Sequence, residues 1–304
     1  MKRVEFTNWV FKIASFVAAV SMLLLIVGIL ISLFVESVPA IRHFGFFKFL
    51  TSTEWSLKDN TFGALRPLTG TVISTFLALI VATPIAIGTA IFLTSICPPK
   101  LKGGIGAAIE LLAAIPSIIY GMWGLFVMAP VLDSYVQPVL SKTLGKLPLI
   151  GSFFQSSMTG GVNLFSASMI LSVMIIPFIA SISRDAFDQT PAMLKESSYA
   201  LGATKWETIW RVEMAYAKSA ISGGIILAMG RALGETMAVA YVIGNRHAAL
   251  ESIFSPYTTI TSVMANEFNE SSGLQLSSLF TLALVLFIAN FLVILLGKRI
   301  IRRS

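Results

Sequence analysis

The sequence is short of charged residues. Only 12% of its 304 residues are Asp, Glu, Lys or Arg, roughly half of the share of about 25% found in soluble globular domains. Because 56% of the residues are hydrophobic, the chain has too little polar surface to cover a water-soluble fold. This composition excludes ordinary soluble enzymes, secreted domains and disordered chains. It predicts an integral membrane protein, with spans of about 20 apolar residues each.

Residues that build metal, haem and disulfide sites are also scarce. The chain has two His and one Cys, and Cys97 stands beside Pro98 and Pro99. Neither a metal site nor a disulfide framework is expected from such a set. The nucleotide-binding pattern G-x-x-x-x-G-K-[ST] and the hydrolase patterns H-E-x-x-H and G-x-S-x-G are missing as well. We expect this chain to bind no cofactor and not to be an enzyme, so uphill transport would need energy from a partner or an ion gradient.

Six apolar segments are long enough to cross a membrane as helices. They cover roughly residues 12–35, 68–93, 106–131, 162–183, 219–243 and 274–297. The first segment follows Lys2 and Arg3, as in a signal peptide, but it is longer than the 7–15 apolar residues typical of such a peptide. We therefore expect it to remain as a span. The predicted fold class is all-α integral membrane, with six transmembrane helices.

Basic residues are distributed unequally between the two sides of this arrangement. An even number of spans places both termini on one side, and that side carries fourteen Lys and Arg residues against seven in the opposite loops. Because cytoplasmic loops carry the excess of Lys and Arg, we expect both termini in the cytoplasm and the protein in the bacterial plasma (inner) membrane. The chain is predicted to divide into an N-terminal helix with an external loop (1–67), a core (68–297) with a cytoplasmic loop at 184–218, and a basic tail (298–304).

The fifth segment carries two charges near its middle, Arg231 and Glu235. At 1.5 Å per residue, Arg231 would lie roughly 18 Å into a hydrocarbon core about 30 Å thick, where each charge costs about 2.5–3.5 kcal/mol. Four residues apart on one helix, the two side chains would share a face. They could form a structural ion pair, or Arg231 could line the path of an anion with Glu235 orienting it, because a guanidinium suits phosphate or carboxylate oxygens. Glu110, in the third segment, is a weaker candidate for the same path.

The loop 184–218 is predicted to hold two short helices joined by a glycine turn. Thr190 and Pro191 fit an N-cap and a first helical position, Gly202 fits a left-handed helix end, and Thr204 to Glu207 fits a capping box. Large apolar side chains would lie outside the bilayer here: Met193, Leu194, Trp206, Ile209 and Trp210. The loop is either an amphipathic segment on the lipid surface or a docking knob for a partner subunit.

The same loop resembles the "EAA" loop of ABC-importer permeases. Residues 196–202 read Glu-Ser-Ser-Tyr-Ala-Leu-Gly, which keeps the Glu-to-Gly spacing and departs at Ser197 and Ser198. In that family the loop forms a coupling helix that sits in a groove of the ATPase subunit. The resemblance implies ATPase-coupling roles for Glu196, Ala200, Gly202 and Trp206.

Two further runs are similar to permeases of the bacterial phosphate importers. They read Ile-Pro-Ser-Ile-Ile-Tyr-Gly at 115–121 and Gly-Arg-Ala-Leu-Gly-Glu-Thr-Met-Ala-Val at 230–239, and the resemblance covers about residues 10–300. It implies the type I importer fold, import of inorganic phosphate, and substrate-path roles for Arg231 and Glu235. It also implies a PstA-like second permease, a pair of PstB-like ATPase subunits that bind ATP and Mg, and a PstS-like external phosphate-binding protein.

Three alternatives remain open at this stage. The chain could be a permease for another oxyanion, such as sulfate or molybdate. It could be a proton-coupled secondary carrier in which Glu235 takes up a proton, although a self-sufficient carrier needs no docking knob. A purely structural or assembly role would leave Arg231 as a helix staple.

Overall fold

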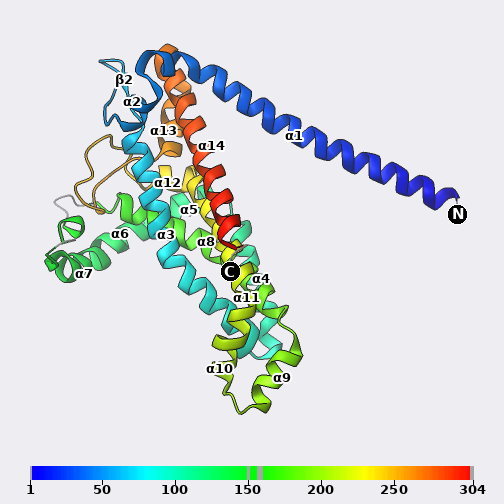
Figure 1. Ribbon diagram of the computed structural model, residues 1–304. Coiled ribbons are helices and arrows are strands. Elements are labelled where there is room, and N and C mark those ends of the chain that lie inside the picture. The colour runs from blue at the N-terminus through cyan, green and yellow to red at the C-terminus, as the bar shows by residue number, and fades with distance from the viewer. Residues whose placement is uncertain (1, 149–150, 156–159, 302–304) are drawn as a thin grey trace.

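The computed structural model describes residues 2–148, 151–155 and 160–301, and almost all of them are helical (Figure 1). The long helices are α1 (Lys2–Phe44), α3 (Leu65–Ile91), α4 (Pro99–Ala114), α8 (Leu164–Asp188), α11 (Met214–Leu233) and α14 (Gly273–Ile301). The shorter α-helices are α2 (Phe46–Thr51), α5 (Ser117–Trp123), α6 (Ala129–Val131), α7 (Gln137–Thr143), α9 (Ala192–Ala200), α10 (Lys205–Thr208), α12 (Met237–Ala240) and α13 (Ile260–Glu267). Strands β1 (Trp55–Ser56) and β2 (Thr61–Phe62) pair antiparallel. The all-α prediction is confirmed.

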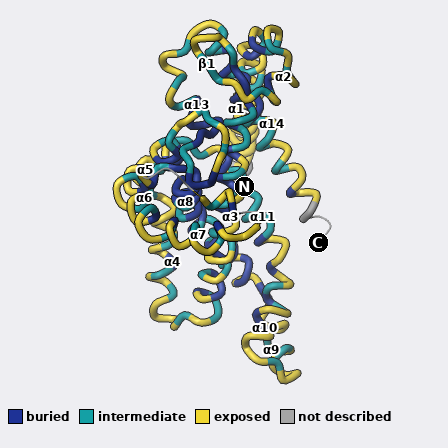
Figure 2. Tube along the Cα trace, turned by 90° about the vertical axis from the view of Figure 1, so that its left-hand side faces the viewer, coloured by how far each residue is buried: buried dark blue, intermediate teal, exposed yellow. Residues whose placement is uncertain are grey.

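Helix α8 is the centre of the core. Ile170, Leu171, Ile175 and Ile179 on it are fully buried, as expected of a helix that is apolar all round. Helices α3 and α11 pack along α8, and the buried residues form a dark column in that region of Figure 2. The helix begins at Asn163, whose Oδ1 accepts a hydrogen bond from the Ser166 amide at 2.9 Å.

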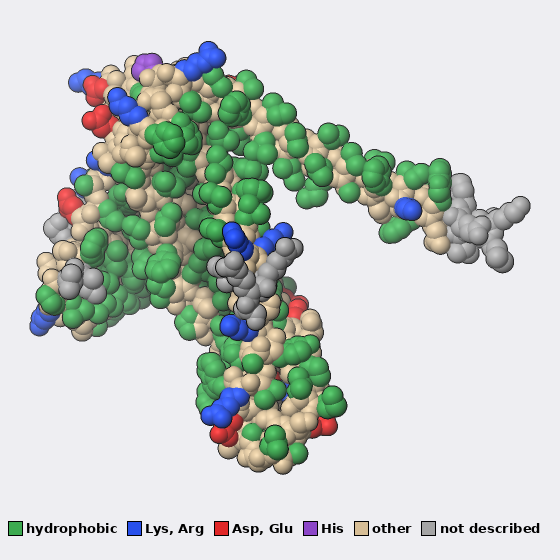
Figure 3. Space-filling model, viewed as in Figure 1, with side chains coloured by type: hydrophobic (Ala, Val, Ile, Leu, Met, Phe, Trp, Pro, Cys, Tyr) green, Lys and Arg blue, Asp and Glu red, His purple; other side chains and the backbone are tan. Residues whose placement is uncertain are grey.

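Two ends of the molecule are polar. At the hairpin end lie α2, the β1–β2 hairpin and α13, and at the opposite end α9, α10 and the π-helical turn Ile209–Glu213 project as a knob, residues 189–213 (Figure 1). Apolar side chains cover most of the body between the two ends, as Figure 3 shows. This arrangement fits a protein whose middle is surrounded by lipid.

Helix α1 leaves the body as a long apolar arm and packs against α14 near its own C-terminal end (Figure 1). At that contact the Ser277 hydroxyl donates to the Glu36 carbonyl at 2.7 Å and accepts from the Ala40 amide at 3.0 Å. It thereby joins the two backbone groups that an unbroken helix would pair directly. Pro39 lies between them, and a proline inside a helix removes a backbone donor.

Among the described residues, five helical stretches are long and apolar enough to cross a membrane. They are Asn8–Phe44, Leu65–Ile96, Ser117–Lys146, Leu164–Asp188 and Gly273–Arg299. Three of them contain the predicted first, second and sixth segments, and a fourth covers the predicted fourth segment except for its first two residues. Together they establish an integral membrane protein. Arg302 and Arg303 of the predicted basic tail lie outside the described residues.

The predicted third and fifth segments are both helical but broken. Helix α4 ends at Ala114, and Ile115 and Pro116 are extended, with ψ of 130° and 137°. A proline disfavours the helical conformation of the residue before it. The helix resumes at Ser117, so the apolar span begins about ten residues later than residues 106–131 predict.

In the fifth segment α11 ends at Leu233, and Gly234 has φ −90° and ψ 0°. A continuous helix over residues 219–243 is therefore wrong. Glycine is a weak helix former, and an outside partner is available because the Thr261 hydroxyl donates to the Glu235 carbonyl at 2.7 Å. Only the short α12 follows the break.

Candidate functional site

Arg231 lies in the last turn of α11 with an exposed side chain. A cation is stabilised at this position by the helix dipole, whose C-terminal end is negative. No ion pair involves Arg231 within the described residues. Glu235 lies beyond the helix end and is half-buried, and its Oε1 accepts from the Ala238 amide at 3.4 Å. The predicted shared helix face is wrong, because α11 ends between the two residues, and an intrachain Arg231–Glu235 staple is not formed.

The two sequence runs at 115–121 and 230–239 meet in space. Gly121 on α5 faces α12 so closely that a Cβ atom there would lie 2.9 Å from the Tyr241 ring and 3.1 Å from the Ala238 Cα. The neighbouring Tyr120 is buried and donates from its hydroxyl to the Leu112 carbonyl at 2.8 Å. The broken third segment thus supports the helix break that carries Arg231 and Glu235.

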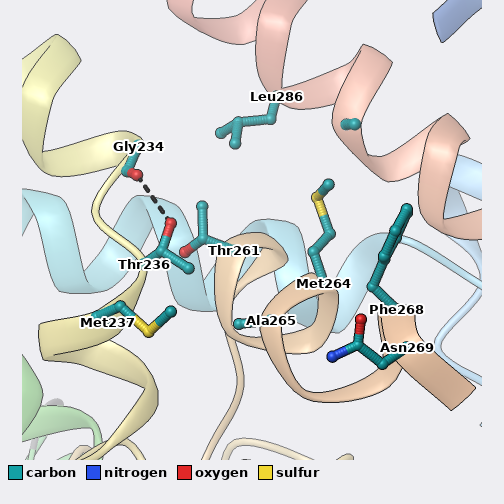
Figure 4. Close-up of a pocket in the computed structure, with 10 residues that line it drawn as sticks. Gly234, Thr236, Met237, Thr261, Met264, Ala265, Phe268, Asn269 and Leu286 are labelled. Carbon is teal, nitrogen blue, oxygen red and sulfur yellow. Dashed lines mark hydrogen bonds between the residues drawn. The ribbon is translucent and has the colours of Figure 1, made fainter.

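A hollow of about 500 Å³ opens beside this break, between α12, α13 and α14 (Figure 4). It is lined by Gly234, Thr236, Met237, Thr261, Met264, Ala265, Phe268, Asn269, Ala283 and Leu286. Thr236 donates to the Gly234 carbonyl at 3.2 Å. None of these lining residues is charged, and Arg231 itself is not among them.

Glu110 lies on α4, on the knob side of the Ile115–Pro116 break. Its Oε1 pairs with Arg184 Nη2 at 2.9 Å, and Arg184 also pairs with Asp185 at 3.0 Å. Lys102 pairs with Asp188 at 3.1 Å beside them, around a polar hollow of about 500 Å³. A substrate-path role for Glu110 stays a prediction, and the structure does not bring Glu110 into contact with Arg231 or Glu235.

The knob has the predicted turn. Gly202 has φ +84°, and the amides of Gly202 and Ala203 donate to the carbonyls of Tyr199 at 2.9 Å and Ser198 at 3.1 Å. This pairing is the Schellman arrangement, which closes a helix through a left-handed residue. The glycine turn is therefore confirmed.

Two helix starts were predicted for the knob, and the structure confirms the one at Thr204 but not the one at Thr190. The Thr204–Glu207 capping box is present, and hydrogen bonds from the backbone and hydroxyl of Thr204 lower the pKa of Glu207. At α9 the N-cap is Pro191, whose ψ of 133° is extended. Thr190 was predicted for that position, but it lies one residue too early, and its buried hydroxyl has no partner within the described residues.

All four predicted coupling residues, Glu196, Ala200, Gly202 and Trp206, are exposed on the knob. Large apolar side chains surround them: Met193 (72% exposed), Leu201 (89%), Trp206 (57%) and Trp210 (50%). Inside the knob, Lys195 pairs at 3.1 Å with the buried carboxylate of Glu213, which also accepts a hydrogen bond from the Ser95 hydroxyl of the body at 3.5 Å. Its outer face is therefore apolar, ordered and uncovered within this chain.

A polar network at the hairpin end was not foreseen. His247 stacks on Trp55 with 5.4 Å between the ring centroids, and its Nε2 lies 3.1 Å from Glu267 Oε1. Glu267 also accepts from Trp55 Nε1 at 3.0 Å and Gln275 Nε2 at 2.9 Å. Burial raises the pKa of Glu267, but these hydrogen bonds outweigh it and leave the pKa below its ordinary value.

The fold and the site together define a multi-pass helical membrane permease. Among solved structures, the chain is similar to the inward-facing MetNI methionine ABC transporter, with a TM-score of 0.57 and 18% identity over 79% of this chain and 94% of that one. It is also similar to a bacterial alginate ABC transporter, with a TM-score of 0.56 and 16% identity over 89% and 87% of the two chains. At these identities the likeness shows the fold, that of type I ABC importer permeases.

Comparison of the sequence identifies the family to which the chain belongs. Residues 61–303 match the family "Binding-protein-dependent transport system inner membrane component", and the chain belongs to that family. It is 48% identical to the phosphate transport system permease protein PstC of Pasteurella multocida, over 94% of this chain and 88% of the relative. It is 47% identical to PstC of Mesorhizobium japonicum, over 100% and 92%, and 34% identical to a probable PstC of Methanocaldococcus jannaschii, over 96% and 93%.

Proposed function

We propose that the chain is the permease subunit of an ATP-driven importer of inorganic phosphate. The observation that carries the proposal is the exposed Arg231 at a helix break within an apolar segment. A guanidinium placed there is costly in lipid, so it needs an aqueous path or an anion. The identity of 47–48% to proteins named PstC supports phosphate as that anion.

The likeness to these relatives also supports the sidedness and the partners. The knob would face the cytoplasm, with both termini on that side, and the hairpin end would face outward. A PstA-like permease would complete the path, a PstB-like ATPase dimer would bind ATP and Mg and hold the knob, and a PstS-like protein would deliver phosphate to the hairpin end.

The chain's own residues suggest how import proceeds. ATP-driven closure of the ATPase dimer would move the knob through its apolar outer face, chiefly Leu201, Trp206 and Trp210. The spans would then rock between outward and inward openings. Arg231 would meet phosphate at the helix break with charge-assisted hydrogen bonds, and the absence of further cations in the neighbouring hollow leaves the anion able to depart.

Uptake into proteoliposomes tests the proposal. The four-component complex, loaded with ATP, should import phosphate, and excess sulfate or molybdate should compete poorly. Equal competition by either anion would assign a different oxyanion. Import by this chain alone, dependent on a proton gradient and indifferent to ATP, would establish the secondary-carrier alternative and overturn the proposal.

A further inference from the structure

Helix α4 is attached to the body by few contacts, and polar ones are prominent among them. Gly106 is its one buried residue. Two ion pairs join α4 to the knob end of α8, Lys102–Asp188 at 3.1 Å and Glu110–Arg184 at 2.9 Å. A Cβ at Gly106 would lie 3.2 Å from Arg184 Nη1, so the glycine lets the guanidinium lie close against the helix.

These ion pairs form a joint that can open. The side chains of Lys102 and Asp188 are 39% and 46% exposed, and that of Glu110 is 56% exposed. Exposed ion pairs contribute little to stability, because water replaces the partner at small cost. Arg184 also has a second carboxylate, Asp185, at 3.0 Å, to which it can stay bonded when Glu110 moves away. The joint therefore has two polar arrangements available, as an element that transmits coupling requires.

One end of this joint leads directly into the knob. Asp188 is the last residue of α8, and α9 begins at Ala192. Within the knob, the Lys195–Glu213 pair at 3.1 Å joins α9 to the turn that continues into α11. A tilt of the knob would therefore displace the end of α8, where Asp188 and Arg184 hold α4.

The other end of α4 leads to Arg231. Across the Ile115–Pro116 break, the Tyr120 hydroxyl donates to the Leu112 carbonyl at 2.8 Å, which ties α5 to the last turn of α4. Tyr120 is buried, and Gly121 beside it packs on α12, the short helix that follows the break after Arg231. Movement of α4 is thus carried to the residues around the helix break.

We propose that α4 relays movement of the knob to Arg231, with the Lys102–Asp188 and Glu110–Arg184 pairs as its joint to α8 and Tyr120 as the positioning residue. The relay rests on the proposed function, because it assumes that an ATPase moves the knob. It gives Glu110 a role in coupling, separate from the substrate-path role predicted for it.

The test measures anion imported per ATP hydrolysed by the reconstituted complex. Asp188→Lys should lower this ratio about fivefold, the size expected of a coupling residue, while ATP hydrolysis and copurification of the ATPase stay unchanged. The exchanged pair Lys102→Asp with Asp188→Lys should restore the ratio. Lys298→Asp, a charge reversal at an exposed site in the last turn of α14, is the matched control and should leave the ratio at the wild-type value.

Tyr120→Phe tests the second half of the relay, since it keeps the ring and removes the bond to Leu112. We expect a similar loss of import per ATP with unchanged hydrolysis. A wild-type ratio in Asp188→Lys or Tyr120→Phe, failure of the exchanged pair to restore the ratio, or loss of the ATPase from the Asp188→Lys complex would each overturn the relay. A wild-type complex that imports no anion would instead refute the proposed function.

Discussion

Arg231 and Glu235 lie on opposite sides of the end of α11. The arginine is in the last helical turn with an exposed side chain, whereas Glu235 follows Gly234 and directs its carboxylate to the Ala238 amide, 3.4 Å away. Glu235 is bonded to the backbone, and within the described residues no ion pair joins it to Arg231. This separation favours a binding role for Arg231 over that of an internal staple.

Replacing Arg231 tests that role. Arg231→Gln should lower phosphate uptake roughly 10- to 100-fold, as expected for loss of charge-assisted hydrogen bonds worth about 1.5–3 kcal/mol. Phosphate uptake by Arg231→Lys should lie between that of the wild type and that of Arg231→Gln, because lysine keeps the charge but not the planar fork of donors. Proteoliposome uptake and subunit copurification measure both effects. Normal uptake by a fully assembled Arg231→Gln complex would remove Arg231 from the path.

The conformation of Gly202 is expected to matter for coupling. At φ +84° an alanine is strained by about 1 kcal/mol, so Gly202→Ala should disturb the turn and weaken retention of the ATPase about fivefold. Gly88→Ala is the control, since both glycines have open space around them and only Gly202 has a positive φ. Pull-down of the ATPase subunit reports the effect, and equal retention by the two variants would contradict it.

The apolar face of the knob should carry the docking energy. Exposed tryptophans that become buried at an interface often cost 2 kcal/mol or more when truncated, so Trp206→Ala should weaken ATPase binding about 30-fold. The thermal stability of the chain should hardly change, because Trp206 is 57% exposed. Leu57→Ala, at a 60% exposed site of the hairpin end, should leave binding intact. An unaffected Trp206→Ala complex would move the docking surface elsewhere.

Gly70 should be intolerant of any side chain. A Cβ there would overlap the Thr258 carbonyl oxygen and lie 2.8 Å from the Tyr257 ring, so Gly70→Ala forces α3 away from the loop before α13. Overpacking of this kind costs about 1–3 kcal/mol, which corresponds to a Tm lower by about 5 °C. Thermal unfolding in detergent measures the shift, and a Tm equal to that of Gly88→Ala would refute the close contact.

The network around Glu267 should make the hairpin end sensitive to acid. The pKa of Glu267 is lowered in the folded chain, so its stabilising contribution is fully present above the unfolded value of about 4.3. The contribution is lost as the pH falls through the lower folded pKa. Glu267→Gln should therefore have a lower Tm than the wild type at pH 7, and the difference should shrink in acid. A difference that is independent of pH would show that the carboxylate charge is not what holds the network.

Local signals in the sequence predicted local structure well. The Gly202 turn and the Thr204 capping box each depend on a few neighbouring residues whose chemistry decides the backbone conformation. Hydropathy likewise located the membrane-crossing regions, because it reports burial in lipid. It could not locate the breaks at Ile115–Pro116 and Gly234, since apolar residues continue across both and the partner that satisfies the second break, Thr261, is distant in the sequence.

The same limit explains what was missed. The stacking of His247 on Trp55 and the bonds to Glu267 join residues up to 212 positions apart, and no periodicity indicates them. The one available signal was His247 itself, because the chain has only two histidines. Glu110 was recognised as an unusual carboxylate near a span, but its pairing with Arg184 depends on the packing of α4 on α8, which the sequence pattern does not specify.

The hydroxyl of Ser277 has a consequence for how the protein sits in a membrane. Since it bridges the Glu36 carbonyl and the Ala40 amide, both backbone groups beside Pro39 are hydrogen-bonded without water. The long apolar arm is thereby tied to α14 at a point where surrounding lipid could not supply a hydrogen bond.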